Sequence, residues 1–392
     1  MVLEYSKESA KKFLLSHQLL FPPRKIEGKR GIQKVFQHLR ALQYDPQNPC
    51  GRNIDILLQA RVKYIHPNDY YYWLYNKRRG IEVYDKELSV VPIEDIAFCR
   101  GRFPPSRRRK LNSFLVKNKS RLGKLIKLIR KEGPLCSSDI KENQKVDIFW
   151  ESANWSRVAL DSLWRAGKLV ISHRENGRKY YDLPSKVYGS KLSSLQKDKD
   201  GLKKETVLRR IQAVGMLPIS GTGSGWKGVG TGKEITPLLS GLIRAGELVE
   251  VKVKGTEKHY IAKKKSIELL SKLKNKDPAP QMSFLPPLDN LLWDREMIEE
   301  IFGFSYTWGA YKPKKDREYG HYVLPILFGS DFIGRIELRL DKEKNVLEII
   351  GFWIEKGKSW DKKTKNAFFN YLDDFMKYLQ AEKIKWICHC PI

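Results

Sequence analysis

Two stretches of the chain share one pattern of residues, and this near-repeat constrains the fold more than any other feature. Residues 163–183 read LWRAGKLVISHRENGRKYYDL, and residues 242–261 read LIRAGELVEVKVKGTEKHYI. Each combines the end of a helix, an Ala-Gly stop, a strand, a turn that contains glycine, and a returning strand. Gly167 and Gly246 stand where a helix end favours a left-handed residue, and the strand, glycine and strand that follow are typical of a hairpin. A helix followed by such a hairpin is the sequence pattern of a winged helix.

Helical segments precede both copies of the repeat. Upstream of the first copy lie RLGKLIKLIRKEGPLCSSDI and a candidate recognition helix, ESANWSRVALDSLWRAG. Upstream of the second copy lie KKETVLRRIQAVGMLPIS and EITPLLSGLIRAG, which supply the same parts. The N-terminal stretch RGIQKVFQHLRALQYDP looks like a third unit, in which a helix leads into a strand. We therefore expect an α+β protein built from tandem winged helices, a fold based on the helix-turn-helix.

The C-terminal third follows a different pattern. Residues 322–355 alternate like antiparallel strands, and residues 364–382 return to a helical period. The stretches at 190–200 and 273–281 are polar and linker-like. Together these features predict four domains: an N-terminal winged-helix-like domain at 1–115, a second winged helix at 116–190, a third winged helix at 198–268, and a C-terminal β-rich α+β domain at 280–392.

The balance of charge indicates a polyanionic partner. The 392 residues include 74 Lys and Arg against 45 Asp and Glu, which gives a formal charge of +29. Folding does not need so large a charge, and its usual use is contact with nucleic acid or an anionic membrane. No run approaches the roughly 18 apolar residues of a membrane span. The N-terminus reads as an amphipathic helix capped near Ser6 and not as a signal peptide.

Nucleic acid is therefore the expected partner, and no membrane partner is expected. The five cysteines form no disulfide framework for a chain of this length. A reduced, cytoplasmic setting follows as the simplest expectation, with the protein associated with the nucleoid when it is bound to DNA. We expect it to act as a monomer.

Basic residues gather ahead of the first repeat copy. Acidic residues are absent between Arg100 and Lys131. A run of charge is often only a solvated face, but this one leads into a winged-helix unit of a basic chain, which favours phosphate contact. Such contacts give affinity and salt sensitivity, and they do not select a sequence. The DNA-binding residues that we predict are Arg52, Asn53, Arg107, Arg108, Arg109, Lys110, Arg157, Arg174, Arg178 and Lys227.

The glycine-rich stretch GTGSGWKGVGTGK at residues 221–233 does not meet the requirements of a phosphate-binding loop. Glu234 stands where the motif requires Ser or Thr, and Lys227 stands where it requires the first glycine. We interpret the stretch as a loop of the third winged unit that contacts DNA through Trp226 and Lys227.

Three other features carry weaker signals. Cys388-His389-Cys390 has no second ligand cluster, whereas a structural zinc site needs four ligands. We therefore predict no metal site and no other cofactor. His321, in YGHYV, is expected to be a packed or surface histidine. Glu82 is an acidic residue within a mostly apolar stretch.

The stretch LRALQYDPQNPCGRN at residues 39–53 contains the strongest candidate site. In a strand, Gln43 and Asp45 project to the same face. From this geometry alone two readings remain open. In one, Asp45 caps the following turn and Gln43 is a polar position on a half-buried strand. In the other, the amide and the carboxylate form a site, and Arg52 and Asn53 hold a phosphate or orient the carboxylate.

Three stretches resemble one known family: LQYDP with GRN and LLQARV, then IEVYDKELSVVPIED, and above all FLPPLDNLLWDREMIEEIFGFSYTWGAYKPKKDREYGHYVLPILFGSDFIGRIEL. They are similar to the AlkZ/YcaQ family of winged-helix DNA glycosylases, which repair alkylated and crosslinked DNA. The similarity covers nearly the whole chain and is most specific in the C-terminal stretch. It implies tandem winged helices with a C-terminal β-rich domain, and double-stranded DNA with alkylated or crosslinked purines as the substrate.

In that family a Gln-x-Gln or Gln-x-Asp motif carries the catalysis. The resemblance therefore implies that Gln43 and Asp45 are the catalytic residues, in the Gln-x-Asp form of the branch that unhooks crosslinks. The chain departs from the family pattern in one respect. Many relatives have a histidine shortly after the motif, where this chain has Arg52-Asn53-Ile54-Asp55.

The implied chemistry needs neither a general acid nor a cofactor, because an N7-alkylated guanine is already cationic and can leave without protonation. Asp45 would stabilise the oxocarbenium-like sugar and polarise a water, and Gln43 would hold that water. The resemblance thus implies a monofunctional DNA glycosylase that hydrolyses the N-glycosidic bond of cationic N-alkylpurines, including N7-linked guanine interstrand crosslinks. The alternative is a non-enzymatic winged-helix DNA-binding protein, such as a transcription regulator.

Overall fold

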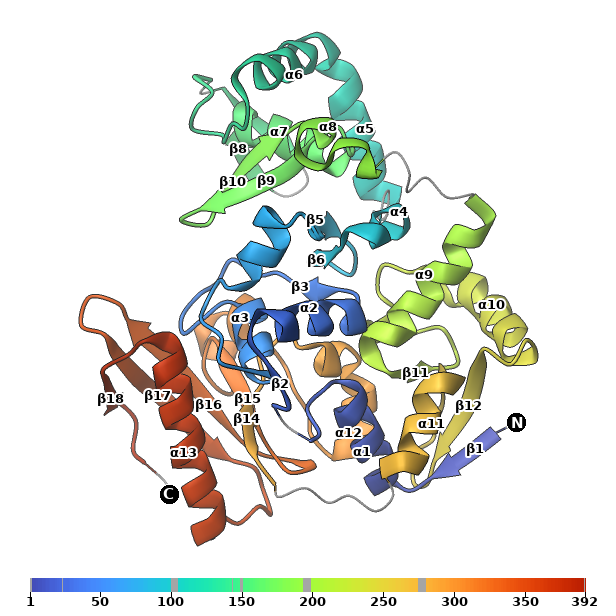
Figure 1. The fold of residues 1–392 in the computed structure, drawn as a ribbon, viewed down its shortest axis with the longest axis vertical. Helices are drawn as coiled ribbons and strands as arrows, with labels where there is room; N and C mark the ends of the chain where they lie inside the picture. Colours follow the sequence, from blue (N-terminus) through green and yellow to red (C-terminus); the bar gives the residue numbers. More distant parts are fainter. Residues whose placement is uncertain are drawn as a thin grey trace. The chain divides into compact units, whose positions relative to one another are not determined.

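The chain divides into two compact units in the computed structural model (Figure 1). The first unit contains residues 1–70 and 207–392, and the second contains residues 71–206. Residues 71–115, which the sequence grouped with the N-terminal domain, belong to the second unit. The structure describes residues 2–22, 24–99, 105–142, 144–148, 151–192, 199–273, 280–390 and 392.

The N-terminal part of the first unit is mainly helical. The hydroxyl of Ser6 accepts a hydrogen bond of 3.1 Å from the N–H of Ser9, so the predicted helix with its cap at Ser6 is confirmed. The short strands β2 and β4 pair in parallel. The elements are β1 (Val2–Tyr5), α1 (Lys7–His17), β2 (Ile26–Glu27), α2 (Gly28–Leu39), β3 (Leu42–Gln43), α3 (Asn53–Gln59) and β4 (Val62–Lys63).

Two histidines, the buried His17 and the half-buried His38, join helices α1 and α2 to helix α9 (Lys199–Val214). The rings of His17 and His38 lie 4.9 Å apart between centroids. His17 Nε2 lies 2.7 Å from the carbonyl oxygen of Gln212, and His38 Nε2 lies 2.7 Å from the carbonyl oxygen of His17. Because a carbonyl only accepts, both Nε2 atoms carry a proton. Burial, reinforced by His38, lowers the pKa of His17 to about 3.

The segment that holds the second repeat copy forms a four-stranded sheet with flanking helices. β12 pairs with β13, and β13 pairs with β11, all antiparallel. β1 adds to the other edge of β12 in parallel, a long-range pairing that the sequence did not reveal. Gly246 has φ +71° after helix α10, as the repeat predicted. The elements after α9 are β11 (Met216–Pro218), η4 (Ser224–Trp226), α10 (Gly232–Arg244), β12 (Leu248–Val253), β13 (His259–Lys263) and α11 (Lys264–Leu273).

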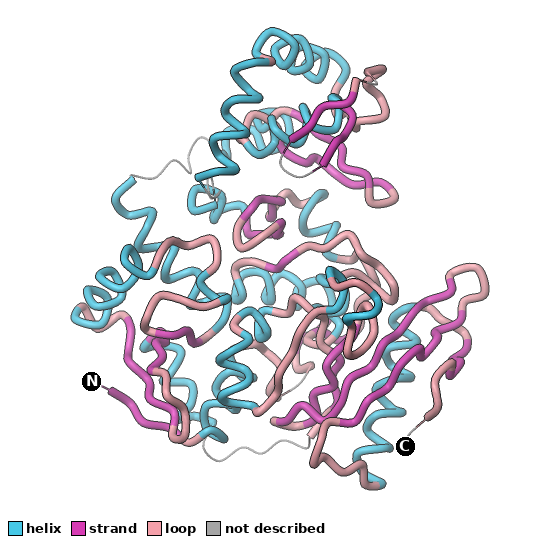
Figure 2. The backbone as a smooth tube through the Cα atoms, turned by 180° about the vertical axis from the view of Figure 1, so that it is seen from behind, coloured by secondary structure: helices cyan, strands magenta, loops and turns pink. Residues whose placement is uncertain are grey.

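The C-terminal part contains a five-stranded sheet, in the order β14, β15, β16, β17, β18. Its long strands are the magenta segments near the C-terminus in Figure 2. The antiparallel strands predicted over residues 322–355 are confirmed. Helix α13 packs on the sheet through Phe368 and Phe375, whose rings contact Phe284 of β14. The elements are β14 (Met282–Phe284), η5 (Asn290–Trp293), α12 (Arg295–Phe302), η6 (Gly309–Tyr311), η7 (Lys314–Asp316), β15 (Val323–Phe328), β16 (Asp331–Asp341), β17 (Val346–Ile354), α13 (Lys362–Leu379) and β18 (Lys383–Trp386).

One buried ion pair ties the N-terminal helices to the C-terminal part. Both terminal nitrogens of the Arg61 guanidinium donate to the carboxylate of Asp289 at 2.8 Å, and its Nε donates to the carbonyl of Gln18 at 2.7 Å. The Arg61 and Asp289 side chains are fully buried. Removing one member of such a pair leaves an uncompensated charge inside the protein, which is strongly destabilising.

The second unit contains the first repeat copy. Gly167 has φ +71°, and the predicted hairpin forms from β9 and β10. The candidate recognition helix begins at Trp155, because Glu151–Asn154 pairs with Lys145–Ile148 as a hairpin instead of extending the helix. An isolated bridge joins Leu135 to Tyr181.

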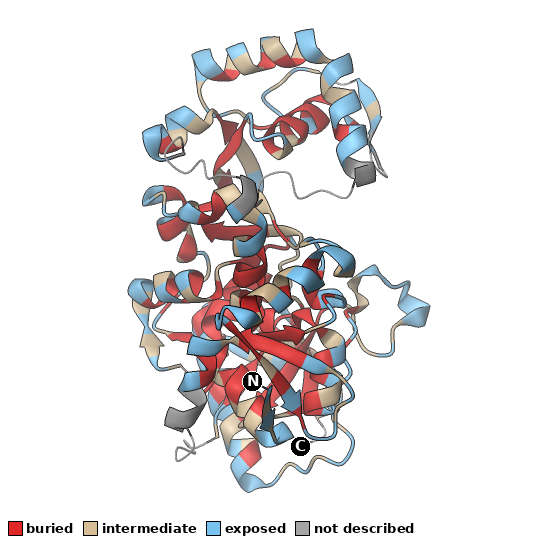
Figure 3. Ribbon diagram, turned by 90° about the vertical axis from the view of Figure 1, so that its right-hand side faces the viewer, coloured by how far each residue is buried: buried red, intermediate tan, exposed pale blue. Residues whose placement is uncertain are grey.

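Buried residues gather on the strands and on the inner faces of the helices, as Figure 3 shows. The elements of the second unit are η1 (Tyr72–Asn76), β5 (Gly80–Tyr84), β6 (Leu88–Pro92), η2 (Ile93–Asp95), α4 (Ile96–Cys99), α5 (Pro105–Lys117), α6 (Lys119–Glu132), β7 (Lys145–Ile148), β8 (Glu151–Asn154), α7 (Trp155–Arg165), β9 (Val170–Glu175), β10 (Arg178–Asp182), α8 (Pro184–Tyr188) and η3 (Gly189–Leu192).

Candidate active site

The Gln-x-Asp segment follows helix α2 in the first unit. Strand β3 covers only Leu42 and Gln43, so the strand is shorter than the sequence pattern predicted. Leu42, Gln43, Tyr44 and Asp45 are all less than 8% exposed. The reading of a half-buried strand with one polar face is therefore wrong, because both faces of this segment are covered.

The side-chain oxygen of Gln43 is an unusual feature of this segment. Gln43 Oε1 is buried and has no hydrogen-bond partner within the residues that the structure describes. Buried polar atoms in proteins are nearly always hydrogen-bonded, and an unpaired one needs an explanation such as strain, a catalytic role, or a water or ligand that completes the bonding. An amide oxygen is an acceptor. The site therefore offers an acceptor suited to an O–H group.

Asp45 caps a turn and is also part of the candidate site. Its Oδ1 accepts a hydrogen bond of 2.8 Å from the backbone N–H of Gln47, so the turn-capping reading is correct. Burial raises the pKa of the Asp45 carboxyl above its ordinary value, while the Gln47 N–H and nearby His321 act in the opposite direction. The two readings that the sequence left open thus do not exclude each other.

Asn53 fixes the motif from one side. Its Nδ2 donates to the carbonyl of Gln43 at 2.8 Å, and its Oδ1 accepts from the backbone N–H of Leu288 at 3.0 Å. Close by, Asn290 Nδ2 donates to the carbonyl of Ala41 at 2.9 Å. Asn53 is fully buried, so the prediction that it contacts DNA is wrong.

The C-terminal sheet fixes the same segment from further along the chain. The backbone N–H of Leu340, on β16, donates to the carbonyl of Pro49 at 2.6 Å. His321 Nε2 lies 3.0 Å from Gln47 Oε1. The sequence treated His321 as a packed or surface histidine and did not single out Gln47. Nothing in the local sequence could have paired two residues that lie 274 positions apart.

Arg52 lies at the start of helix α3 beside the motif. Its guanidinium donates to Asn68 Oδ1 at 2.7 Å and lies 3.9 Å from the Asp55 carboxylate. Its side chain is 13% exposed. Phosphate contact by Arg52 stays a prediction, and the residue also holds the start of the helix.

Arg174 is a second correction to the predicted DNA-binding set. Its guanidinium grips the Glu82 carboxylate, with Nε at 2.9 Å from Oε1 and a terminal nitrogen at 2.6 Å from Oε2. Burial alone would raise the pKa of Glu82, but the adjacent Arg174 lowers it. Tyr75 donates to the same carboxylate. Arg174 is buried in the second unit and is 3% exposed at its side chain, so the prediction that it contacts DNA is wrong.

The other predicted DNA-binding residues lie at the surface. Arg108, Arg109 and Lys110 are exposed on α5, Arg157 is exposed on α7, Arg178 is exposed on β10, and Lys227 is exposed after η4. The side chain of Arg107 lies outside the described part of the chain, as do Arg100 and Arg102. Phosphate contact by these exposed residues stays a prediction. Trp226 is different, because it is 2% exposed and its indole N–H donates to the carbonyl of Pro218, so the prediction that it contacts DNA is wrong.

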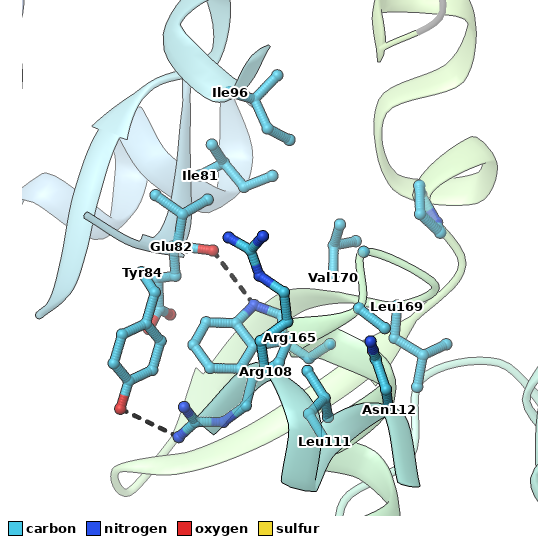
Figure 4. Close-up of a pocket in the computed structure, with 15 residues that line it drawn as sticks. Ile81, Glu82, Tyr84, Ile96, Arg108, Leu111, Asn112, Arg165, Leu169 and Val170 are labelled. Carbon is cyan, nitrogen blue, oxygen red and sulfur yellow. Dashed lines mark hydrogen bonds between the residues drawn. The ribbon is translucent and has the colours of Figure 1, made fainter. Parts of the chain in front are cut away.

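A cavity of about 550 Å³ lies in the second unit, between β5, α5, α7 and β9 (Figure 4). Its wall is largely apolar, and Arg108 and Asn112 of α5 contribute polar groups. Arg165 donates to the hydroxyl of Tyr84 at 3.0 Å, and the Trp164 indole donates to the carbonyl of Glu82 at 3.2 Å. These bonds join the β5–β6 hairpin to helix α7.

The described residues contain no group of three or more His, Cys, Asp and Glu side chains placed to hold a metal ion. Among these same residues, no helix is long and apolar enough to cross a membrane.

Comparison with known proteins shows the family to which the chain belongs. A family model described as "DNA glycosylase AlkZ-like" matches residues 36–377. Because the match spans most of the chain, the protein is a DNA glycosylase, and DNA is what it binds. It belongs to the AlkZ-like family. The solved structure of the Streptomyces sahachiroi DNA glycosylase AlkZ is similar, with a TM-score of 0.64 and 11% identity over 98% of this chain and 100% of that chain. At this identity the likeness concerns the mixed α+β fold.

Proposed function

We propose that the protein is a monofunctional DNA glycosylase that hydrolyses the N-glycosidic bond of cationic N-alkylpurines, including N7-linked guanine interstrand crosslinks, in DNA repair. The observation that carries the proposal is the buried, unmet acceptor of Gln43 two residues before a buried Asp45. Both lie in a segment that is held by hydrogen bonds on either side.

The proposed reaction uses the charge that the lesion already carries. As the C1′–N9 bond breaks, the cationic base leaves as a neutral base and positive charge develops on the sugar. The carboxylate of Asp45 stabilises that charge. A water that donates one hydrogen bond to Gln43 Oε1 attacks C1′ and gives up its proton to Asp45 or to solvent. Chemistry of this kind needs neither an amine nucleophile nor a metal.

Winged helices are the proposed DNA-binding framework. The order α9, β11, η4, α10, β12 and β13 matches helix, strand, turn, recognition helix and wing. The segment from α6 to β10 repeats this order, with the Leu135–Tyr181 bridge in place of the first strand. We propose that the exposed arginines and lysines named above contact phosphates, and that the enzyme acts as a monomer in the cytoplasm and associates with the nucleoid.

One experiment tests the proposed activity. The protein is incubated with duplexes that contain N7-methylguanine or a nitrogen-mustard crosslink, and abasic product is measured. We expect release by the wild type and at least a hundredfold slower release by Asp45→Asn, on the scale of losing one electrostatic stabiliser. The rate of base release is expected to fall less in Gln43→Ala than in Asp45→Asn. Asp373→Asn and Gln37→Ala, both at exposed helix positions, are the matched controls.

The outcomes separate the proposal from its rival. Full activity of both Gln43→Ala and Asp45→Asn contradicts the mechanism. Sequence-specific binding without release from any lesion favours a non-enzymatic winged-helix regulator instead. Asp45→Asn keeps an acceptor for the Gln47 N–H, so a lowered melting temperature in Asp45→Ala, which loses that acceptor, indicates a structural role for the turn-capping bond.

A further inference from the structure

His321 lies two hydrogen bonds away from the Asp45 carboxylate. Its Nε2 lies 3.0 Å from Gln47 Oε1. Because an amide oxygen only accepts, the imidazole is the donor in this bond. The backbone N–H of the same Gln47 donates to Asp45 Oδ1 at 2.8 Å. A single residue therefore connects the imidazole to the proposed catalytic carboxylate.

The position of His321 is fixed by its own backbone. The N–H groups of His321 and Tyr322 both donate to Glu337 Oε1, at 2.7 and 2.8 Å. A side chain at the preceding residue, Gly320, would overlap the Glu337 carboxylate and would force it to shift from its present position. Glu337 lies on strand β16, and His321 comes just before strand β15. The sheet thus presents the imidazole to the motif from a rigid edge.

Among the ionisable groups near Asp45, His321 is a base, whereas Tyr322 and Cys50 are acids. Tyr322 and Cys50 are buried, and burial raises the pKa of each far enough to keep both neutral at physiological pH. Two further acidic groups contribute to these shifts. Glu337 raises the pKa of Cys50, and Asp55 raises the pKa of Tyr322. The electrostatic effect of His321 lowers the pKa of Asp45, and it therefore opposes the effect of burial, which raises that pKa.

We infer that His321 is a positioning residue of the glycosylase, which holds the Asp45 turn in place through Gln47 and, in its imidazolium form, balances the Asp45 carboxylate. This inference rests on the function proposed above. It assigns two separable actions to one side chain, namely a hydrogen bond that acts at every pH and a charge that acts only when the imidazole is protonated.

The two actions predict different behaviour on either side of neutral pH. Without the charge, the pKa of Asp45 rises further, and a carboxylate with a raised pKa loses its ionised form at a higher pH as the solution is acidified. The acid side of the pH profile for base release therefore moves upward. Without the hydrogen bond, the turn is misplaced, and the rate falls at every pH.

The test measures single-turnover release of N7-methylguanine from pH 5 to pH 9. We expect His321→Ala to lose about tenfold or more in rate at pH 8 and to show an acid limb raised by roughly half a pH unit or more. His321→Gln places an amide donor where Nε2 stands. The His321→Gln variant should recover most of the rate at pH 8 and should keep the raised acid limb. A merely structural role of His321 would not produce this combination.

Two further variants keep the inference testable if His321→Ala folds poorly. Gln47→Ala removes the connection from its other end and should lower the rate at pH 8 without changing any ionisable group. His389→Ala, at an exposed histidine after β18, is the matched control and should behave as the wild type. A wild type that releases base while His321→Ala keeps its rate and pH profile overturns the inference alone. A wild type that releases no base from any lesion overturns the proposed function instead.

Discussion

The buried His17 makes stability depend on pH. Burial lowers the pKa of His17 from 6.5 to about 3 in the folded protein. Between these two values the unfolded chain binds a proton that the folded protein does not, so stability falls as the pH falls. One pKa unit corresponds to about 1.4 kcal/mol. Between pH 7.5 and pH 4.5, His17 alone should therefore cost about 3 kcal/mol of the free energy of unfolding.

The variant His17→Gln isolates this effect. A glutamine has an amide that can donate to the Gln212 carbonyl, and it does not titrate. We expect urea unfolding midpoints of the wild type to fall more steeply with acid than those of His17→Gln, with a difference that corresponds to about 3 kcal/mol. The comparison cancels the general effect of acid on a chain of charge +29. Parallel curves for the two proteins would refute the reasoning, and His259→Gln serves as an exposed control.

Three further predictions concern single contacts. Asp289→Ala leaves Arg61 buried without its partner and should cost about 3–5 kcal/mol, measured as a lowered urea midpoint, whereas an effect below 1 kcal/mol would contradict the pairing. Asn53→Ala removes the bonds to the motif backbone and should slow base release while its affinity for uncleaved DNA, measured by fluorescence anisotropy, stays within about twofold. Arg109→Ala and Lys110→Ala should each weaken DNA binding alike for all sequences and reduce the salt dependence by about one counterion; unchanged salt slopes would remove α5 from the interface.

The local elements of this fold were readable from the sequence. The Ala-Gly stops and hairpins of the near-repeat appear where the pattern placed them, because caps and turns depend on neighbouring residues. Strand β1 was missed, since its partner β12 lies almost 250 residues away and no local pattern encodes a parallel pairing.

The site was only partly readable for a related reason. The family resemblance implied Gln43 and Asp45, whose catalytic role is the proposal made above, whereas residue type alone pointed to Asn53 and Arg174, because a sequence does not show which polar groups are already paired inside the protein. The sequence alone does not distinguish an arginine that neutralises Glu82 inside the protein from an arginine that contacts a phosphate. The link from His321 to the motif arises only when the C-terminal sheet has folded against it.

The hydrogen bonds that hold residues 41–53 have a consequence for how the enzyme is made. The motif emerges early in synthesis, whereas Leu288, Asn290, His321 and Leu340 emerge near its end. Until they do, the Gln-x-Asp segment lacks the bonds that shape it. Under the proposed mechanism, the Gln-x-Asp segment can release a base only after the last third of the chain has been made and has folded.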